Sequence, residues 1–255
     1  MANQIYSRDT LRSGITVKPG QSTSFTVKAL ATVAEYDAVG GPPSSGVDQG
    51  GNTFGPTEPG EYIIVGLWKH TSQSEWALSK IEWGTPLREN TGSLEVFVKG
   101  AWKPLIQFTS VTKSELEEMY ESYYKKTGLP TTWLFNDFGH ITCFIAKDLN
   151  HDGKWESNTE KIHHQFFHST PKDEGLSSQG KANEIELKIS HGCIHVKPGD
   201  MDEMISKGYM KKGNMVYIHD YGTRPLGPNE IETAQPPFSL HFFPGMKKLF
   251  VKGQK

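Results

Sequence analysis

The chain is poor in cysteine and in long apolar runs, and its charges nearly balance. Its 255 residues include only Cys143 and Cys193, too few for the disulfide framework of a small secreted domain or for a cysteine-rich metal site. No window approaches the roughly 20 apolar residues that cross a bilayer, so no membrane span is expected. The formal net charge of -2 gives no basic field for a phosphate backbone, so nucleic acid is not expected as a partner.

No secretory leader is expected in the opening residues of this sequence. Residues 1–9 show neither the basic nor the apolar segment of a signal peptide. The sequence therefore predicts either a protein that stays in the cytoplasm until a non-classical route exports it, or one whose leader has been removed.

Short alternating runs and frequent turn residues predict a mainly β fold with peripheral helices. We expect an N-terminal extension over 1–20, one β-rich domain over 20–220, and a C-terminal extension over 221–255 that packs on that domain. A breaker-rich loop over 39–60 is predicted to form the lip of a groove. The expected strands are 22–30, 61–67, 94–98, 141–146, 162–167 and 215–219, and the expected helices are 113–125 and 200–208.

The residues with the clearest chemistry are Cys193, inside Ser190-His191-Gly192-Cys193, and the upstream pair His168-Ser169. A thiol becomes a strong nucleophile when a base removes its proton, and imidazole is the usual base. Acyl transfer also needs a group that returns the proton to the leaving amine and donors for the oxyanion. The pattern predicts a cysteine enzyme, whereas Cys143, in an apolar run, is predicted to be a buried small hydrophobe.

The histidine followed downstream by Ser-His-Gly-Cys resembles the signature of L,D-transpeptidase catalytic domains of the YkuD type. Weaker likenesses lie at 55–62, a turn before a strand, at 81–88, a wall strand, and at 213–218, a closing strand. The resemblance covers roughly residues 20–220. It implies a β-sandwich or barrel-like domain that needs no cofactor and acts on peptidoglycan stem peptides in the periplasm or cell wall.

The resemblance also implies the roles of the motif residues. Cys193 attacks a stem carbonyl and forms an acyl-enzyme, which passes to an amine or to water. The activity is then transpeptidation, L,D-carboxypeptidase trimming or D-amino-acid exchange. His168 acts as general base and acid, and Ser169 steadies it. His191 supports the loop and tunes the thiol, and Gly192 contributes to the oxyanion hole.

Three residues are predicted to contact substrate: Ser190, Trp83 and His195. His195 departs from the family pattern, in which arginine or asparagine usually stands two places after the cysteine. A neutral imidazole offers a single weaker donor where arginine offers a fixed fork for a carboxylate. The interval before Ser190 is also longer than usual, and its polar stretch over 172–183 is predicted to form a flap at the groove.

A second motif has the alternating oxygen ligands and glycine of a calcium loop, although its twelfth position is Thr159 in place of a bidentate glutamate. The alternative is a polar hairpin turn between strands 141–146 and 162–167. A bound Ca²⁺ would brace the strand that bears His168. The predicted ligands are Asp148, Asn150, Asp152, Lys154 and Glu156.

Other functional readings stay open. A non-catalytic calcium-binding β-sandwich module that binds cell wall or a protein partner is the alternative; a depressed thiol pKa would favour the enzyme. A papain-like peptidase is disfavoured because there the cysteine precedes the histidine. The missing leader also suggests an antibacterial cell-wall effector, whose partners would be an immunity protein or a secretion-machine component.

Overall fold

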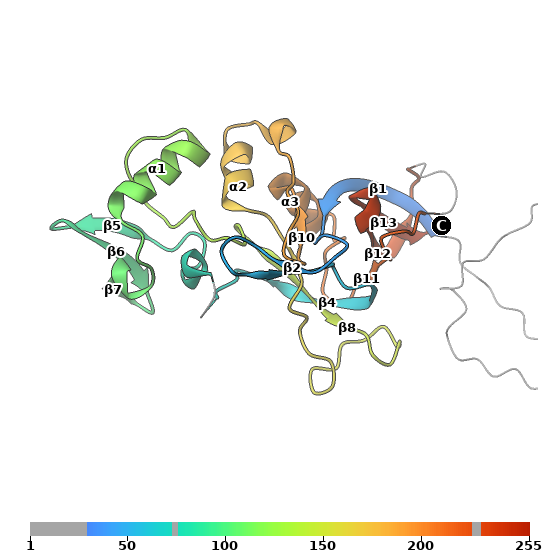
Figure 1. Cartoon of the computed structure of the whole chain (residues 1–255). Helices are drawn as coiled ribbons and strands as arrows, with labels where there is room; N and C mark the ends of the chain where they lie inside the picture. The colour runs from blue at the N-terminus through green and yellow to red at the C-terminus, as the bar shows by residue number, and fades with distance from the viewer. Residues whose placement is uncertain (1–29, 73–75, 226–230) are drawn as a thin grey trace, which may run out of the picture.

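The computed structural model describes residues 30–72, 76–225 and 231–255. Its centre is a closed barrel of eight strands (Figure 1). They follow the order β1, β10, β9, β8, β4, β11, β12 and β13, and β13 pairs with β1 to close the ring. Their bounds are β1 Leu30–Val39, β4 Gly60–Trp68, β8 Thr142–Lys147, β9 Phe167–His168, β10 Ile194–Val196, β11 Met215–Ile218, β12 Gln235–Phe243 and β13 Lys248–Gln254.

Alternate side chains of the strands fill the barrel because successive residues of a strand point to opposite faces. On β8, Cys143 and Ile145 are fully buried in the barrel core, whereas Phe144 belongs to a cluster outside it. Helix α3 (Pro198–Ser206) packs Met201 and Met204 on the same core. The mainly β, barrel-like architecture predicted from the sequence is confirmed.

The C-terminal strands are part of the barrel. β12 runs parallel to β11 and antiparallel to β13, and β13 pairs with β1 along most of its length. The region 221–255, predicted as an extension packed on the domain, therefore completes the ring. The predicted extension at 1–20 lies outside the described residues, as does the predicted strand 22–30 apart from Leu30.

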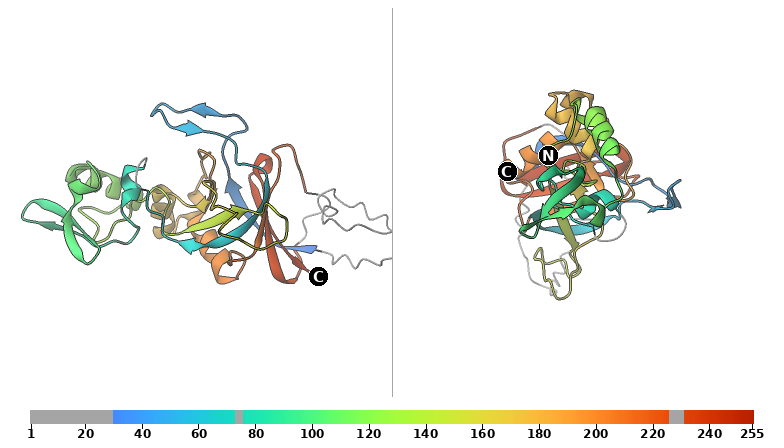
Figure 2. Two further views of the ribbon diagram at one scale, coloured as in Figure 1. Left: turned by 90° about the horizontal axis from the view of Figure 1, so that it is seen from below. Right: turned by 90° about the vertical axis from the view of Figure 1, so that its left-hand side faces the viewer.

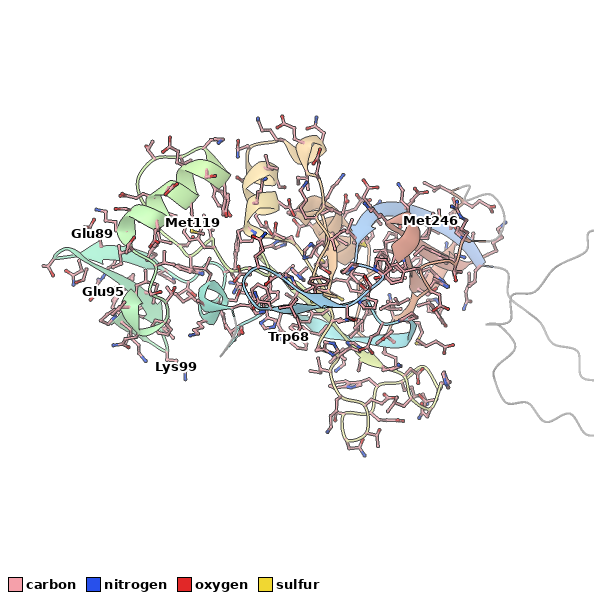
Figure 3. All side chains as sticks on the ribbon, in the orientation of Figure 1. Trp68, Glu89, Glu95, Lys99, Met119 and Met246 are labelled. Carbon is pink, nitrogen blue, oxygen red and sulfur yellow. The ribbon has the colours of Figure 1, made fainter. Side chains whose placement is uncertain are left out.

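A second lobe stands beside the barrel, at the left of Figure 1. It holds the sheet of β5 (Leu87–Asn90), β6 (Ser93–Val98) and β7 (Ala101–Pro104), together with helix α1 (Lys113–Tyr124). Its own core includes Trp133 and Phe135, both fully buried. Charged side chains such as Glu89, Glu95 and Lys99 lie on its outer part (Figure 3).

The loop predicted as a groove lip forms a small hairpin of β2 (Gly46–Val47) and β3 (Thr53–Phe54). It projects from the barrel in the left view of Figure 2. Residues from both of its strands line the main cavity of the molecule, so the lip prediction is confirmed.

Most predicted elements are present, with two corrections. β9 is only Phe167–His168 and shares just Phe167 with the strand predicted at 162–167, because Gln165 N–H bonds to the side chain of His163 and the ladder breaks there. Residues 172–183, predicted as a flap, instead contain helix α2 (Pro171–Ser178), which packs against α1 and α3. Thr170 caps this helix and Pro171 begins it. Within the described ranges, no helix is long and apolar enough to cross a membrane.

Candidate active site

The parallel pair β9 and β10 brings the two predicted reactive residues together. Their register places Phe167 opposite Ile194 and His168 opposite His195. Phe167 and Ile194 point into the barrel core. Because side chains alternate, His168, Cys193 and His195 project from the opposite face of these strands.

That face opens into a cavity of about 1140 Å³. Its wall includes five of the residues predicted for the site, namely Cys193, His168, His195, His191 and Ser190. Trp83, predicted to stack on substrate, is half-buried but does not line the cavity, and Trp76 does. The remaining lining residues are Ser45, Gly46, Thr53, Phe54, Gly55, Pro56, Glu58, His70, Ser72, Asp137, Phe138, Phe144, His163, His164, Gln165, Phe166, Thr170, Pro171 and Ile189.

The surroundings of the Cys193 thiol favour its protonated form. It packs against the apolar cluster that contains Phe138 and Phe166, and its Sγ donates to His164 O at 3.9 Å. Burial raises the pKa of the thiol to about 11, against the smaller lowering by a hydrogen bond with the Phe166 backbone. The depressed thiol pKa that would favour the enzyme over a non-catalytic module is therefore not found.

His168 presents a hydrogen-bond acceptor in the same cavity wall as the thiol. It is 4% exposed, and its Nδ1–H donates to Ser169 O at 2.6 Å. In the neutral ring this leaves Nε2 as a bare acceptor. Burial, followed by the neighbouring His195, holds the pKa of His168 well below 6.5, so the ring is neutral at pH 7. Ser169 thus orients His168 through its carbonyl group.

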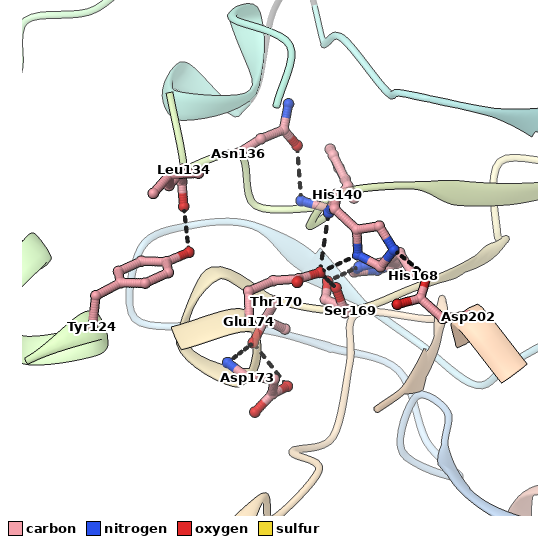
Figure 4. A network of polar contacts seen from close by, with 11 residues as sticks. Tyr124, Leu134, Asn136, His140, His168, Ser169, Thr170, Asp173, Glu174 and Asp202 are labelled. Atoms are coloured by element: carbon pink, nitrogen blue, oxygen red, sulfur yellow. Dashed lines mark hydrogen bonds and ion pairs between the residues drawn. The ribbon is translucent and has the colours of Figure 1, made fainter. Parts of the chain in front are cut away.

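The hydroxyl of Ser169 anchors a buried polar network (Figure 4). It donates to Glu174 Oε1 on α2, which also accepts from His140 N–H at 3.0 Å and pairs with His140 Nδ1 at 2.6 Å. His140 Nε2 reaches Asp202 at 2.9 Å. The network fixes the segment that follows β9, and with it the carbonyl that orients His168.

Sequence reasoning missed Glu174 and His140, because Glu174 was assigned to an exposed flap. A cap at Thr170, proline at 171 and acids in the next turn are a helix-start signal that could have placed Glu174 on a helix. Its position facing Ser169 depends on tertiary packing.

We expect Glu174→Gln to lower kcat/KM about tenfold, because loosened orientation of a catalytic group costs activity. The loss should fall mainly on kcat, since Glu174 does not line the cavity. Glu184→Gln, at an exposed carboxylate paired with Lys181, is the matched control and should change neither constant. Equal kinetics for the two variants would contradict the positioning role.

Hydrogen bonds within the loop hold Cys193 in place. The Ser190 hydroxyl donates to Cys193 O at 2.5 Å and accepts Gly192 N–H at 3.0 Å. Thr57, in the turn predicted at 55–62, is fully buried and donates to Gly192 O at 2.8 Å. Gly192 has φ +140°, and a side chain there would collide with the Gln165 amide. Ser190, predicted to contact substrate, therefore uses its hydroxyl within the loop.

The same hydrogen bonds show that Gly192, the oxyanion donor predicted from the sequence, is not free to play that role. Gly192 N–H is already taken by Ser190, whereas Cys193 N–H has no acceptor among the described residues. The amide of Cys193 is therefore the free backbone donor next to the thiol, and it can meet an oxyanion.

The two other histidines of the motif face different neighbours. His191 Nε2 lies 2.9 Å from Asp48 of the lip hairpin, a contact that lowers the Asp48 pKa. His195 Nδ1–H donates to Lys188 O at 2.9 Å, and its ring contacts His168 edge-on at 4.6 Å between centroids. Burial lowers the pKa of His195 to about 4. His195 thus presents a bare Nε2 acceptor to the cavity, in place of the donor predicted from the sequence.

One group in the cavity wall has the composition of a metal site. Glu58, His163 and His164 place their ligand atoms within 4.8 Å of one another. His163 Nδ1, however, accepts Gln165 N–H at 3.0 Å, so the ring proton of neutral His163 lies on Nε2, the atom that faces Glu58. A metal would need that nitrogen bare, and the group fits a hydrogen-bonded cluster better.

The predicted calcium loop lies outside the cavity. It connects β8 to β9, and none of its five predicted ligands lines the cavity. The loop is linked to the site by sequence alone, because residues 163–168, which include cavity-lining residues, follow it directly.

A buried histidine beside a cysteine at the wall of an open cavity defines a cysteine–histidine site on a β-barrel. The family model of the L,D-transpeptidase catalytic domain (YkuD) matches residues 13–218, and the chain belongs to this family. No curated protein and no solved structure matches the chain. Family membership gives the protein an L,D-transpeptidase-type activity on peptidoglycan.

Proposed function

We propose that the chain transfers acyl groups of peptidoglycan stem peptides through a thioester on Cys193. The observation that carries the proposal is the placement of Cys193 and neutral, Nε2-bare His168 on one face of paired strands in one cavity. Family membership supports the substrate class and a periplasmic or cell-wall site of action.

In the first step the thiol proton moves from Sγ to His168 Nε2 as sulfur attacks the carbonyl carbon that follows an L-centre of the stem. The oxyanion of the tetrahedral intermediate accepts a hydrogen bond from Cys193 N–H. Collapse breaks the C–N bond, and the proton on His168 passes to the departing nitrogen. A D-amino acid leaves, and the shortened stem stays on the sulfur as a thioester.

In the second step an acceptor attacks the thioester carbon and gives a proton to His168. The C–S bond breaks, and the departing thiolate takes that proton back from His168, which restores the neutral pair. An amine of a second stem gives a crosslink, a free D-amino acid gives exchange, and water gives a trimmed stem. We propose crosslinking as the main reaction, in line with the family activity. Incubating the protein with tetrapeptide muropeptides and weighing the products tests this. Crosslinked dimers are expected, and trimmed monomers alone would contradict it.

The cavity wall favours substrate groups that donate hydrogen bonds. Its described lining holds the carboxylates of Glu58 and Asp137 and contains no lysine or arginine. His195, neutral at pH 7, adds an acceptor. We infer that an amino group of the stem is bound there, and that any substrate carboxylate is held by N–H groups.

The raised thiol pKa predicts slow alkylation at neutral pH. Because iodoacetamide reacts with the thiolate, labelling of Cys193 should speed up about tenfold per unit from about pH 7 to pH 10. Cys143 is the internal control, since burial also raises its pKa and it should stay unlabelled. Labelling that is fast and constant above about pH 7 would show a preformed thiolate and contradict the neutral resting pair.

A further inference from the structure

The loop between β8 and β9 gathers negative charge that no lysine or arginine of the described residues pairs with. It extends from the barrel below β8 in Figure 1. Its carboxylates are Asp148, Asp152, Glu156 and Glu160, and no lysine or arginine in the described part of the chain forms an ion pair with any of them. Two of the four are deeply buried: Asp148 is 3% exposed and Glu160 is 1% exposed. Burying carboxylates without a countercharge costs free energy, and a cation bound in the loop would offset that cost.

The Asp148 side chain is the observation that points to a ligand. Its Oδ2 accepts Gly153 N–H at 3.0 Å, which turns the carboxylate toward the inside of the loop. Its Oδ1 is buried and has no hydrogen-bond partner. A buried carboxylate oxygen without a donor is unfavourable unless a cation meets it.

The remaining oxygens have the spacing of a calcium loop. Counting Asp148 as the first position, Asn150 and Asp152 are third and fifth, Lys154 offers its carbonyl at the seventh, and Glu156 is ninth. Gly153, at the sixth position, has φ +73°, as the sharp turn of such a loop requires.

Glu160 takes over the closing role that Thr159 cannot fill. It lies one residue beyond the twelfth position and folds back into the loop. Its Oε1 accepts Leu149 N–H at 2.9 Å, and its Oε2 accepts Glu156 N–H at 3.0 Å. Glu160 thereby ties the second and ninth positions together, so the ligand-bearing ends of the loop are held close before an ion arrives.

We propose that this loop binds Ca²⁺ through the side chains of Asp148, Asn150, Asp152 and Glu156 and the carbonyl of Lys154, with Glu160 holding the loop closed. Ca²⁺ accepts a set of hard oxygen ligands in flexible geometry, whereas Mg²⁺ demands a near-ideal octahedron.

The bound ion would stabilise the segment of chain that leads from β8 through the loop to the residues around the thiol. Just beyond the loop, Ile162 bridges to Ala146, and His163 N–H donates to Ile145 O at 2.7 Å. The chain then supplies His164, whose carbonyl contacts Cys193, and β9 with His168. The ion is structural in this proposal and takes no part in the chemistry.

Calorimetric titration of the metal-free full chain with CaCl₂ tests the proposal directly. We expect saturable binding with Kd between about 10⁻⁶ and 10⁻³ M, and a Tm that rises with Ca²⁺ concentration. Terbium luminescence excited through Trp155, at the eighth loop position, gives a second readout, and Ca²⁺ should displace the terbium.

Two exposed or half-buried loop ligands give variants that should still fold, Asp152→Asn and Glu156→Gln. Each is expected to weaken Ca²⁺ at least about tenfold. Glu118→Gln, at an exposed carboxylate on α1, is the matched control and should bind like the wild type. The proposal would be overturned if the titration showed no saturable heat of binding up to about 5 mM Ca²⁺, or if Mg²⁺ bound as tightly as Ca²⁺. It would also be overturned if both variants bound Ca²⁺ with the affinity of the wild type.

Discussion

Replacing Cys193 by alanine is expected to abolish release of the terminal D-residue from a tetrapeptide stem. The proposed chemistry has no other nucleophile, and loss of the nucleophile lowers kcat by about 10⁶-fold in a serine protease. The measurement is D-amino-acid release by the purified variant, with far-UV circular dichroism to verify folding.

Cys143→Ala is the matched control, because Cys143 is the other thiol of the chain and is fully buried in the barrel core. It should lose about 1 kcal/mol of unfolding free energy through the small cavity and keep its kcat/KM. If Cys193→Ala kept its activity while Cys143→Ala lost it, the assignment of the nucleophile would be wrong.

Replacing His168 by glutamine should lower kcat/KM by about 10² to 10⁴-fold, the usual contribution of a general base. The wild-type rate should also fall at acid pH as His168 becomes protonated. Because burial lowers the pKa of His168, the midpoint of this fall should lie below 6.5, and neutral His168 should be fully available above it. The variant should lose this acid limb.

Iodoacetamide labelling of Cys193 should persist in His168→Gln, because burial sets the thiol pKa. His151→Gln, at an exposed histidine outside the cavity, serves as control and should keep both rate and pH profile. An acid limb that survives in His168→Gln would assign the base to another residue.

Helices and strands that carry a clear charge order or apolar run in their own sequence were predicted correctly. Helix α1 was expected from its charge order, and a reciprocal cap between Thr112 and Glu115 starts it. It ends at Lys125, in a left-handed conformation, slightly before the glycine expected to stop it. The strands with clear apolar runs, β4, β8 and β11, were also found.

The C-terminal strands were missed because proline normally argues against a sheet strand. Pro236 and Pro237 lie in β12, where the pairing with β13 shifts register between Gln235 and Ser239. The ladder thus skips the residues that cannot donate to it. The register shift that accommodates the two prolines becomes visible only when β12 is paired with β13. The local sequence of β12 does not predict that pairing.

The sequence motifs pointed to Cys193 and His168 as the reactive pair, whereas the surroundings of this pair depend on long-range packing. The Cys193 and His168 motifs are local, and both residues line one cavity. The choice of Trp76 over Trp83, the use of the Ser190 hydroxyl inside the loop and the acceptor character of His195 depend on neighbours far away in sequence. The raised thiol pKa likewise arises from burial by the assembled barrel and cavity wall.

Intact-protein mass spectrometry after brief exposure to a tetrapeptide stem tests the central claim most directly. The account predicts a transient adduct with the mass of the stem minus its terminal D-residue and one water, located on Cys193 by peptide mapping and absent from Cys193→Ala. Turnover by the wild type with no such adduct under acid quench, or an adduct on another residue, would contradict it.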